Sequence, residues 1–215
     1  MTKKPLRVGL FGGTFDPVHR GHVAAALHFY DEAALDVLYV VPDRIPPHKA
    51  DRAAPAQHRL AMVRLAFSPE TVEGRKIVVS DMELCREGKS YTADTVDTLR
   101  QTHDGCRLFL YAGSDMFYTL ETWHRGKELL KTCTVVTTTR KEGEQEKLQT
   151  YAARYQALYG TDCLVMRDPP VEVSSTQVRA ALRTVTREKE TKFTKNLLTE
   201  SVTRYIMENH LYERK

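Results

Sequence analysis

The sequence predicts an α/β fold built on a doubly wound parallel sheet. Short apolar runs typical of buried strands alternate with segments whose apolar residues recur at helical spacing. Strand, helix and strand in alternation form right-handed βαβ units, and these units build a parallel sheet that helices cover on both faces. Because ligands bind such sheets beyond the carboxyl ends of the strands, the loops that follow strands are the first candidates for a functional site.

The expected strands are bounded by residues that interrupt regular structure. The first run stops at Gly12 and Gly13, and the second stops at Pro42. The expected strands are residues 6–11, 37–41, 77–79, 108–112, 135–138 and 163–166. Between them, apolar residues at i, i+3, i+4 and i+7 predict helices, among them residues 23–30, 60–67 and 91–99.

Length and composition favour a single globular domain over residues 1–215. A chain of 215 residues with 41% hydrophobic and 28% charged residues can bury a substantial core. Residues 183–195 are charged, rich in Thr and weakly periodic, which predicts a mobile connection or, alternatively, a patch that contacts a polyanion. Residues 196–212 are expected to form a C-terminal helix, because Leu198, Val202 and Ile206 share one helical face.

Composition also narrows the compartment and the partners. The 4 cysteines lie far apart without a CxxC pair, which argues against a zinc knuckle and against a disulfide-stapled secreted scaffold. With no export signal and no uncharged apolar run of about 18 residues, we expect a cytoplasmic protein without a membrane partner. The net charge of +4 suits phosphate-bearing partners, but no nucleic-acid partner is predicted. The sequence does not indicate an oligomeric state.

The strongest chemical signal is GGTFDPVHRGH at residues 12–22, between the first expected strand and the first expected helix. Glycines let backbone N–H groups approach a ligand, and a helix N-terminus favours an anionic phosphate. His19 and His22 would project from the same side of that helix and could both donate to phosphate oxygens. From these residues alone, a simple turn, two surface histidines and a metal site remain alternatives, although no third metal ligand stands at a recognisable spacing.

A second signal is SSTQVR at residues 174–179. Ser175 and Thr176 could cap a new helix, and Arg179, one turn later, could grip phosphate with its fork of donors. Taken together, GGTFDPVHRGH resembles the HxGH signature and SSTQVR resembles the SSTxxR element of the nucleotidyltransferase superfamily. From Leu6 to about Tyr212, the chain is most similar to the bacterial-type nicotinate-nucleotide adenylyltransferases.

The resemblance implies a Rossmann-like nucleotidyltransferase fold and adenylyl transfer. The phosphate of nicotinate mononucleotide would attack the α-phosphorus of ATP, giving nicotinate adenine dinucleotide and pyrophosphate in a step of NAD biosynthesis, without a covalent enzyme intermediate. His19 and His22 would stabilise the pentacoordinate phosphorus, and Mg²⁺ would bind through the ATP phosphates without protein ligands. The implied ATP-binding residues are Gly12, Gly13, Thr14, Phe15, Ser175, Thr176 and Arg179.

Further motifs resemble the family's acceptor site. PDRIPPHK at residues 42–49 resembles its PxxxPPHK loop, SYTADT at residues 90–95 its SYTxxT element, and residues 113–115 its GxD element. The resemblance implies that Lys49 meets phosphate, Thr92 receives the pyridine carboxylate, Asp115 binds ribose hydroxyls or a base, and Trp123 lies against the nicotinate ring. The implied substrate-binding residues are Lys49, Thr92, Gly113, Asp115, Trp123 and His124. Without the resemblance, SYT is an ordinary helix start and a lone Trp is usually a core residue.

Some positions depart from the family pattern, and rival functions remain. RKEG at residues 140–143 stands where the family often has Arg-Pro-Gly, and Asp43 and Arg44 replace small or Asn residues, so the sequence does not define the roles of Arg140, Asp43 and Arg44. One rival is a pantetheine-phosphate adenylyltransferase or a cytidylyltransferase, against which SYT and Trp123 speak. The other is a binding module for adenine dinucleotides or RNA, against which the two histidines speak. Thr92 and Trp123 favour the acid over the amide acceptor, without giving a ratio.

Overall fold

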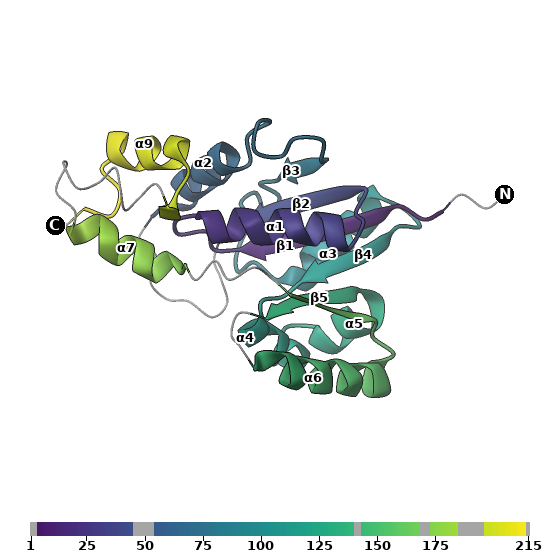
Figure 1. Cartoon of the computed structure of the whole chain (residues 1–215). Helices are drawn as coiled ribbons and strands as arrows, with labels where there is room; N and C mark the ends of the chain where they lie inside the picture. The colour runs from purple at the N-terminus through teal and green to yellow at the C-terminus, as the bar shows by residue number, and fades with distance from the viewer. Residues whose placement is uncertain (1–3, 45–53, 140–142, 168–172, 185–195, 214–215) are drawn as a thin grey trace.

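A computed structural model describes residues 4–44, 54–139, 143–167, 173–184 and 196–213 of the chain. Its centre is a parallel sheet of six strands in the order β3-β2-β1-β4-β5-β6 (Figure 1). The strands are β1 (Arg7–Gly13), β2 (Val37–Pro42), β3 (Ile77–Val79), β4 (Arg107–Tyr111), β5 (Thr134–Thr139) and β6 (Cys163–Arg167). The predicted doubly wound sheet is confirmed, and each expected strand is present to within two residues at either end.

The first strand is longer than expected, because its two glycines pair like any other strand residues. Gly12 and Gly13 lie opposite Val41 and Pro42 in the register of β1 and β2. The carbonyl oxygen of Gly13 then accepts a hydrogen bond from the Asp43 N–H at 3.0 Å. The expectation that the strand ends before the glycines is therefore wrong, and the loop begins only at Thr14.

The three expected helices are confirmed as α1 (Arg20–Glu32), α2 (Ala56–Ala66) and α3 (Thr92–Thr102). Further helical segments connect and follow the later strands. They are α4 (Ser114–Phe117), the short 3₁₀ helix η1 (Leu120–Thr122), α5 (Gly126–Thr132), α6 (Glu144–Tyr159), α7 (Ser175–Thr184) and α9 (Glu200–Glu208). Residues 183 and 184, expected to belong to a mobile connection, are instead the last residues of α7. The rest of that expected connection, residues 185–195, lies outside the described residues.

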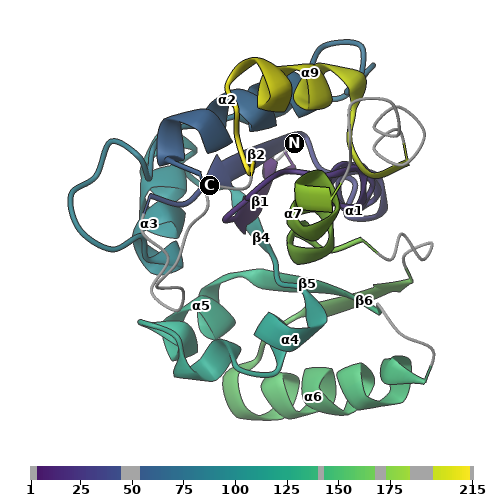
Figure 2. The same ribbon diagram turned by 90° about the vertical axis from the view of Figure 1, so that its left-hand side faces the viewer.

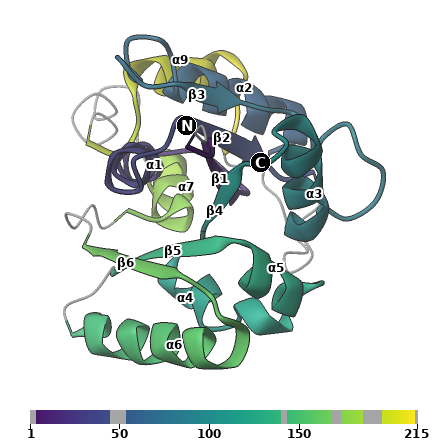
Figure 3. The same cartoon turned by 90° about the vertical axis from the view of Figure 1, so that its right-hand side faces the viewer.

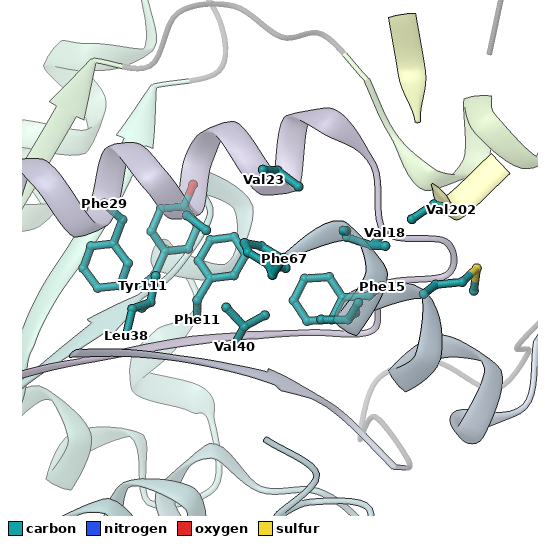
Figure 4. Close-up of a cluster of buried hydrophobic side chains, with 14 of the residues drawn as sticks. Phe11, Phe15, Val18, Val23, Phe29, Leu38, Val40, Phe67, Tyr111 and Val202 are labelled. Atoms are coloured by element: carbon teal, nitrogen blue, oxygen red, sulfur yellow. The ribbon is translucent and has the colours of Figure 1, made fainter. Parts of the chain in front are cut away.

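Alternate strand residues face two separate cores, as the pleat requires. Figures 2 and 3 show α1 and α3 on opposite sides of the sheet. On the α1 side, Phe11 and Tyr111 pack with Phe29 of α1 (Figure 4), and buried residues of α2, α7 and α9 belong to the same cluster. On the other side, Val8 and Leu10 pack with α3, α5 and α6. Both faces of the sheet are thus covered, and its carboxyl edge is where a ligand can enter.

The C-terminal helix is shorter than the expected residues 196–212. The Thr199 side chain caps its start by accepting from the Val202 N–H at 3.4 Å. After α9, His210 and Tyr212 take positive φ values of 50° and 67°, which helical residues do not adopt, so the chain turns back. As predicted, α9 buries its apolar face, and it packs on α2. Of the helices that the structure describes, none is long and apolar enough to cross a bilayer.

Candidate active site

The candidate site lies at the carboxyl edge of the sheet, which faces the viewer in Figure 2. The strand order reverses between β1 and β4, and such a switch point is where open α/β sheets bind ligands. The loop at residues 14–19 leaves β1 there, α4 begins directly after β4, and α7 lies beside α1 (Figure 2). The sequence motifs at residues 12–22, 113–115 and 174–179 therefore come from the same edge.

The loop after β1 is shaped by Phe15. This residue has a φ of 49°, and its ring is 2% exposed, 6.0 Å from the Phe11 ring between centroids. A Cβ at position 13 would lie 3.0 Å from that ring, so any other residue there would push the ring out of its place. The side chain of Phe15 thus belongs to the core, and its backbone is the part suited to a nucleotide.

His19 and His22 cap α1 reciprocally. The His22 N–H donates to His19 Nδ1 at 3.3 Å, and the His19 N–H donates to His22 Nδ1 at 3.2 Å. Their rings stack with centroids 3.6 Å apart, so the expectation that both project from one side of the helix is confirmed. Because each Nδ1 accepts a hydrogen bond, the proton of each neutral imidazole lies on Nε2. Both rings therefore present Nε2–H as their donor.

The second motif contacts the first. From α7, Ser175 Oγ donates to the Pro17 carbonyl at 3.0 Å, and Arg179 Nη1 donates to the Asp16 carbonyl at 2.6 Å. Arg179 Nη2 also donates to Thr176 Oγ1 at 3.3 Å. The structure thus brings the hydroxyl and guanidinium groups of one motif to the loop of the other, although these residues stand near opposite ends of the sequence.

The cap of α7 differs from the expectation. Ser174 Oγ, rather than a hydroxyl of the next two residues, accepts from the Gln177 N–H at 3.2 Å, and the Gln177 side chain accepts from the Ser174 N–H at 2.8 Å. This reciprocal pair satisfies the helix start. Ser175 and Thr176 are therefore not needed as caps, which leaves their hydroxyls for other contacts.

The acceptor motifs gather around the start of α3. Thr92 is the first residue of this helix, and the ring of Tyr91 before it contacts the exposed His124 ring at a tilt of 34°, with centroids 4.3 Å apart. Trp123 is partly buried against the core on that side of the sheet. Arg125, two residues after Trp123, joins this part of the chain to α3 through a 2.6 Å ion pair with Asp97. The predicted carboxylate-binding and ring-stacking elements thus lie together.

Two predicted acceptor residues lie at the start of α4, and a third is not described. The Gly113 carbonyl accepts from the N–H groups of Met116 and Phe117, each at 2.9 Å, which fixes the helix start. Asp115 is exposed in its first turn. Lys49 and Arg140 lie outside the described residues, so the role of Lys49 stays a prediction and that of Arg140 stays undefined.

A family model described as "Cytidylyltransferase-like" matches residues 10–181, which include both signatures. A Bacillus pumilus protein named "Probable nicotinate-nucleotide adenylyltransferase" is 36% identical over 208 residues, covering 96% of this chain and 98% of the relative. A Pseudomonas syringae pv. tomato protein of the same name is 37% identical over 193 residues, 85% of each chain. The chain belongs to the nicotinate-nucleotide adenylyltransferase family.

The fold is also that of solved family members. A Plasmodium falciparum nicotinic acid mononucleotide adenylyltransferase complexed with NaAD superposes with a TM-score of 0.76 at 19% identity, covering 96% of this chain and 97% of that one. A structure of the same protein complexed with APC gives a TM-score of 0.75. At this identity the likeness concerns the fold, and it confirms the expected Rossmann-like nucleotidyltransferase architecture.

Sequence reasoning missed a buried arginine that holds the loop after β1. Arg59 of α2 is 0% exposed, and its Nη1 donates to the Thr14 carbonyl at 2.6 Å and to Asp43 Oδ1 at 3.2 Å. Thr14 Oγ1 in turn donates to Asp43 Oδ2 at 2.8 Å. The undefined role of Asp43 is thus resolved as a structural one: it joins the first residue of the loop to α2. The only signal in the sequence was the position of Arg59, a charged residue directly before the apolar helical pattern of residues 60–67.

A second missed group is Glu83, which lies behind the start of α3. Its side chain is largely buried, and Thr95 Oγ1 donates to Glu83 Oε1 at 2.6 Å. Burial raises the pKa of Glu83, and hydrogen bonds from Thr95 and Ser90 oppose that rise. Ser90 Oγ also accepts from the Arg44 N–H at 2.9 Å, which gives Arg44 a place beside the SYT motif. Asp43 and Arg44, whose roles the sequence did not define, therefore link the loop after β1 to the SYT motif at the start of α3.

Proposed function

We propose that this protein transfers the adenylyl group of ATP to nicotinate mononucleotide, releasing pyrophosphate and forming nicotinate adenine dinucleotide. The observation that carries the proposal is the contact between the two signatures, in which Ser175 and Arg179 bind the backbone of residues 16 and 17. The contact gathers hydroxyl, guanidinium and imidazole donors at one helix start, which suits a polyphosphate. The names of relatives aligned over most of the chain support the same activity.

In this proposal the loop at residues 14–19, called the nucleotide loop below, binds ATP and stabilises the reacting phosphorus together with the residues around it. Backbone N–H groups of residues 12–15 and the side chains of Ser175, Thr176 and Arg179 hold the triphosphate. The Nε2–H groups of His19 and His22 donate to the oxygens on which negative charge grows as the acceptor phosphate attacks the α-phosphorus in line. The bond to the pyrophosphate breaks as the new P–O bond forms. Phosphoryl transfer needs little covalent chemistry from the protein, so positioned donors supply most of the rate.

The acceptor would bind on the α3 and α4 side of the switch point. The Thr92 hydroxyl and the N–H groups at the start of α3 suit the pyridine carboxylate, and Trp123 offers a ring for stacking beside the Tyr91 and His124 pair. Gly113 and Asp115 would take ribose hydroxyls or a base, and Lys49 would orient the attacking phosphate. A carboxylate receptor of this kind favours nicotinate over nicotinamide mononucleotide.

Magnesium would enter as the complex with ATP. The imidazole, hydroxyl and guanidinium groups gathered at the nucleotide loop donate hydrogen bonds, which suits the oxygens of a phosphate. The nearby carboxylates already accept hydrogen bonds from protein donors, Asp16 from Tyr212 and Asp43 from Arg59. Within the described part of the chain, no three His, Cys, Asp or Glu side chains come together as a metal site. Bound in this way, Mg²⁺ neutralises charge on the triphosphate.

Two further proposals concern the whole chain. We propose that residues 1–215 act as one domain, because both cores share a single sheet. We also propose a cytoplasmic location. All four cysteines are free thiols, as in proteins of a reducing compartment.

The test is pyrophosphate release by the purified protein with ATP and Mg²⁺. Nicotinate mononucleotide, nicotinamide mononucleotide, phosphopantetheine and no acceptor are compared in parallel. Turnover largely confined to the nicotinate acceptor supports the proposal and its carboxylate site. Release with phosphopantetheine instead moves the protein to another branch of the superfamily, and ATP binding without release with any acceptor favours a binding module.

A further inference from the structure

Asp16 stands at the centre of the nucleotide loop, yet the proposed chemistry gives it no role. It is 6% exposed and lies three residues before His19. Its carbonyl oxygen is the acceptor for Arg179 Nη1. A buried carboxylate needs donors around it, because desolvation without them is costly. The partners of the Asp16 side chain therefore bear directly on the loop that carries His19.

One such partner comes from the far end of the sequence. Tyr212 is 7% exposed, and its hydroxyl donates to Asp16 Oδ1 at 2.7 Å across 196 positions. Burial and the neighbouring Asp16 carboxylate raise the pKa of Tyr212, so its hydroxyl remains protonated and remains a donor. The side chain and the backbone of Asp16 are thus held from two different elements.

The chain after α9 is bent so that Tyr212 can reach this position. His210 and Tyr212 both have positive φ values, and the Leu211 N–H donates to the Ile206 carbonyl at 3.0 Å, which closes the turn. A bulky side chain rarely takes this backbone conformation, and it persists only where surrounding contacts hold it. Figure 2 shows this segment returning from α9 toward β1.

Packing explains the ring of Tyr212 but not its hydroxyl. The ring belongs to the core on the α1 side of the sheet, where a phenylalanine would fill the same space. A buried hydroxyl adds a desolvation cost that only its hydrogen bond offsets. The specific contribution of a tyrosine here is therefore the bond to Asp16.

We propose that Tyr212 is a positioning residue for the nucleotide loop, holding Asp16 so that His19 and the backbone N–H groups of residues 12–15 stay aligned with the phosphates of ATP. This inference rests on the proposed function for its kinetic consequences. It assigns the segment after α9 to the ATP half of the site. The acceptor half, at the starts of α3 and α4, does not depend on it.

Tyr212→Phe and Tyr205→Phe form a matched pair of variants. Each removes one hydroxyl from the C-terminal segment, but Tyr205 bonds His58 of α2 at 3.0 Å, away from the nucleotide loop. We expect Tyr212→Phe to lower kcat/KM for ATP about ten-fold, since hydrogen bonds to charged groups typically contribute that much. We expect KM for nicotinate mononucleotide to change less than about two-fold, and Tyr205→Phe to leave both constants near wild type.

Thermal melts of both variants separate positioning from folding. Equal kinetics in the two variants, or an equal loss toward both substrates, would overturn the proposal. Calorimetric titration with ATP and Mg²⁺ alone tests it without the acceptor. Weaker ATP binding by Tyr212→Phe is expected even if the acceptor is not nicotinate mononucleotide. Equal ATP binding by wild type and variant refutes the inference. If neither protein binds ATP, the proposed function is refuted together with the inference.

Asp16→Asn probes the same bond from its other end. An amide oxygen can still accept from the Tyr212 hydroxyl, so this variant should lose less ATP affinity than Asp16→Ala. In the double variant, the losses of ATP affinity caused by Asp16→Ala and by Tyr212→Phe should not add, because both changes remove the same interaction. Full additivity of the two losses would contradict a shared role.

Discussion

The proposed ATP half of the site, around the loop at residues 14–19, and the proposed acceptor half, at the starts of α3 and α4, are built differently. In the ATP half, buried or partly buried side chains bind the backbone of the nucleotide loop, as Arg59 binds Thr14 and Arg179 binds Asp16. In the acceptor half, the contacts near the surface are a tilted pair of rings, Tyr91 and His124, and ion pairs. The side chains of Arg125 and Asp97 there are 34% and 38% exposed.

The difference teaches which half tolerates change. Buried hydrogen bonds to a backbone fix geometry, and rate depends on geometry to within a fraction of an ångström. Exposed ion pairs contribute little and can rearrange. Substitutions in the ATP half should therefore lower kcat or kcat/KM for ATP, and those in the acceptor half should mainly raise KM for the pyridine nucleotide.

The largest effect is expected from His22→Ala. Loss of a donor to the charge growing on the phosphorus should lower kcat by about two to four orders of magnitude with a modest change in KM. Steady-state pyrophosphate release measures it, and His58→Ala on α2 is the control. A loss below ten-fold would show that the imidazole does not act on the transition state.

Arg179→Lys should have the next largest effect. A lysine cannot reproduce the fork that binds the Asp16 carbonyl and the Thr176 hydroxyl, so kcat/KM for ATP should fall about ten-fold to a hundred-fold. Arg183→Lys, in the last turn of the same helix, should change little. If both variants behave alike, the contact between the signatures is not what organises the ATP half.

Trp123→Ala tests the acceptor half. If the indole stacks on the pyridine ring, KM for nicotinate mononucleotide should rise about ten-fold, in line with stacking energies of about 1–3 kcal/mol per base, while KM for ATP stays near wild type. Trp123→Phe should recover much of the loss. Equal increases in both KM values would instead mark Trp123 as a packing residue.

The smallest effect concerns stability and pH at Glu83. A raised folded-state pKa means that ionisation of this buried carboxyl opposes folding, so stability falls as pH rises from the ordinary value of 4.5 through the folded-state pKa. Glu83→Gln removes this pH dependence while keeping the oxygen that accepts from Thr95. The free energy of unfolding, measured with denaturant between about pH 4 and about pH 8, should rise for the variant relative to wild type as pH rises. The difference between the two proteins should then stay constant at higher pH. If this difference in free energy instead shrinks as pH rises, the folded protein stabilises the ionised form of Glu83.

The sheet and both nucleotide signatures were predictable from the sequence, because apolar runs and short glycine, histidine and hydroxyl motifs are local patterns. The 16-residue helix α6 was not anticipated, since the residues it buries, Leu148 and Tyr155, are too few to set a clear period. The buried position of Arg59 depends on partners in other elements, which no window of sequence contains. The turn after α9 has no glycine at its positive φ positions, so nothing signalled where the helix ends.

The bonds that complete the ATP half join residues 158 and 163 positions apart. A nascent chain emerging from the ribosome as far as β5 already contains the strands that flank β1, but not α7. Such long-range contacts form late, because loop closure must precede them. A prematurely terminated chain would therefore retain much of the sheet and yet lack Ser175 and Arg179, so that synthesis of α7 is also the step that would confer activity.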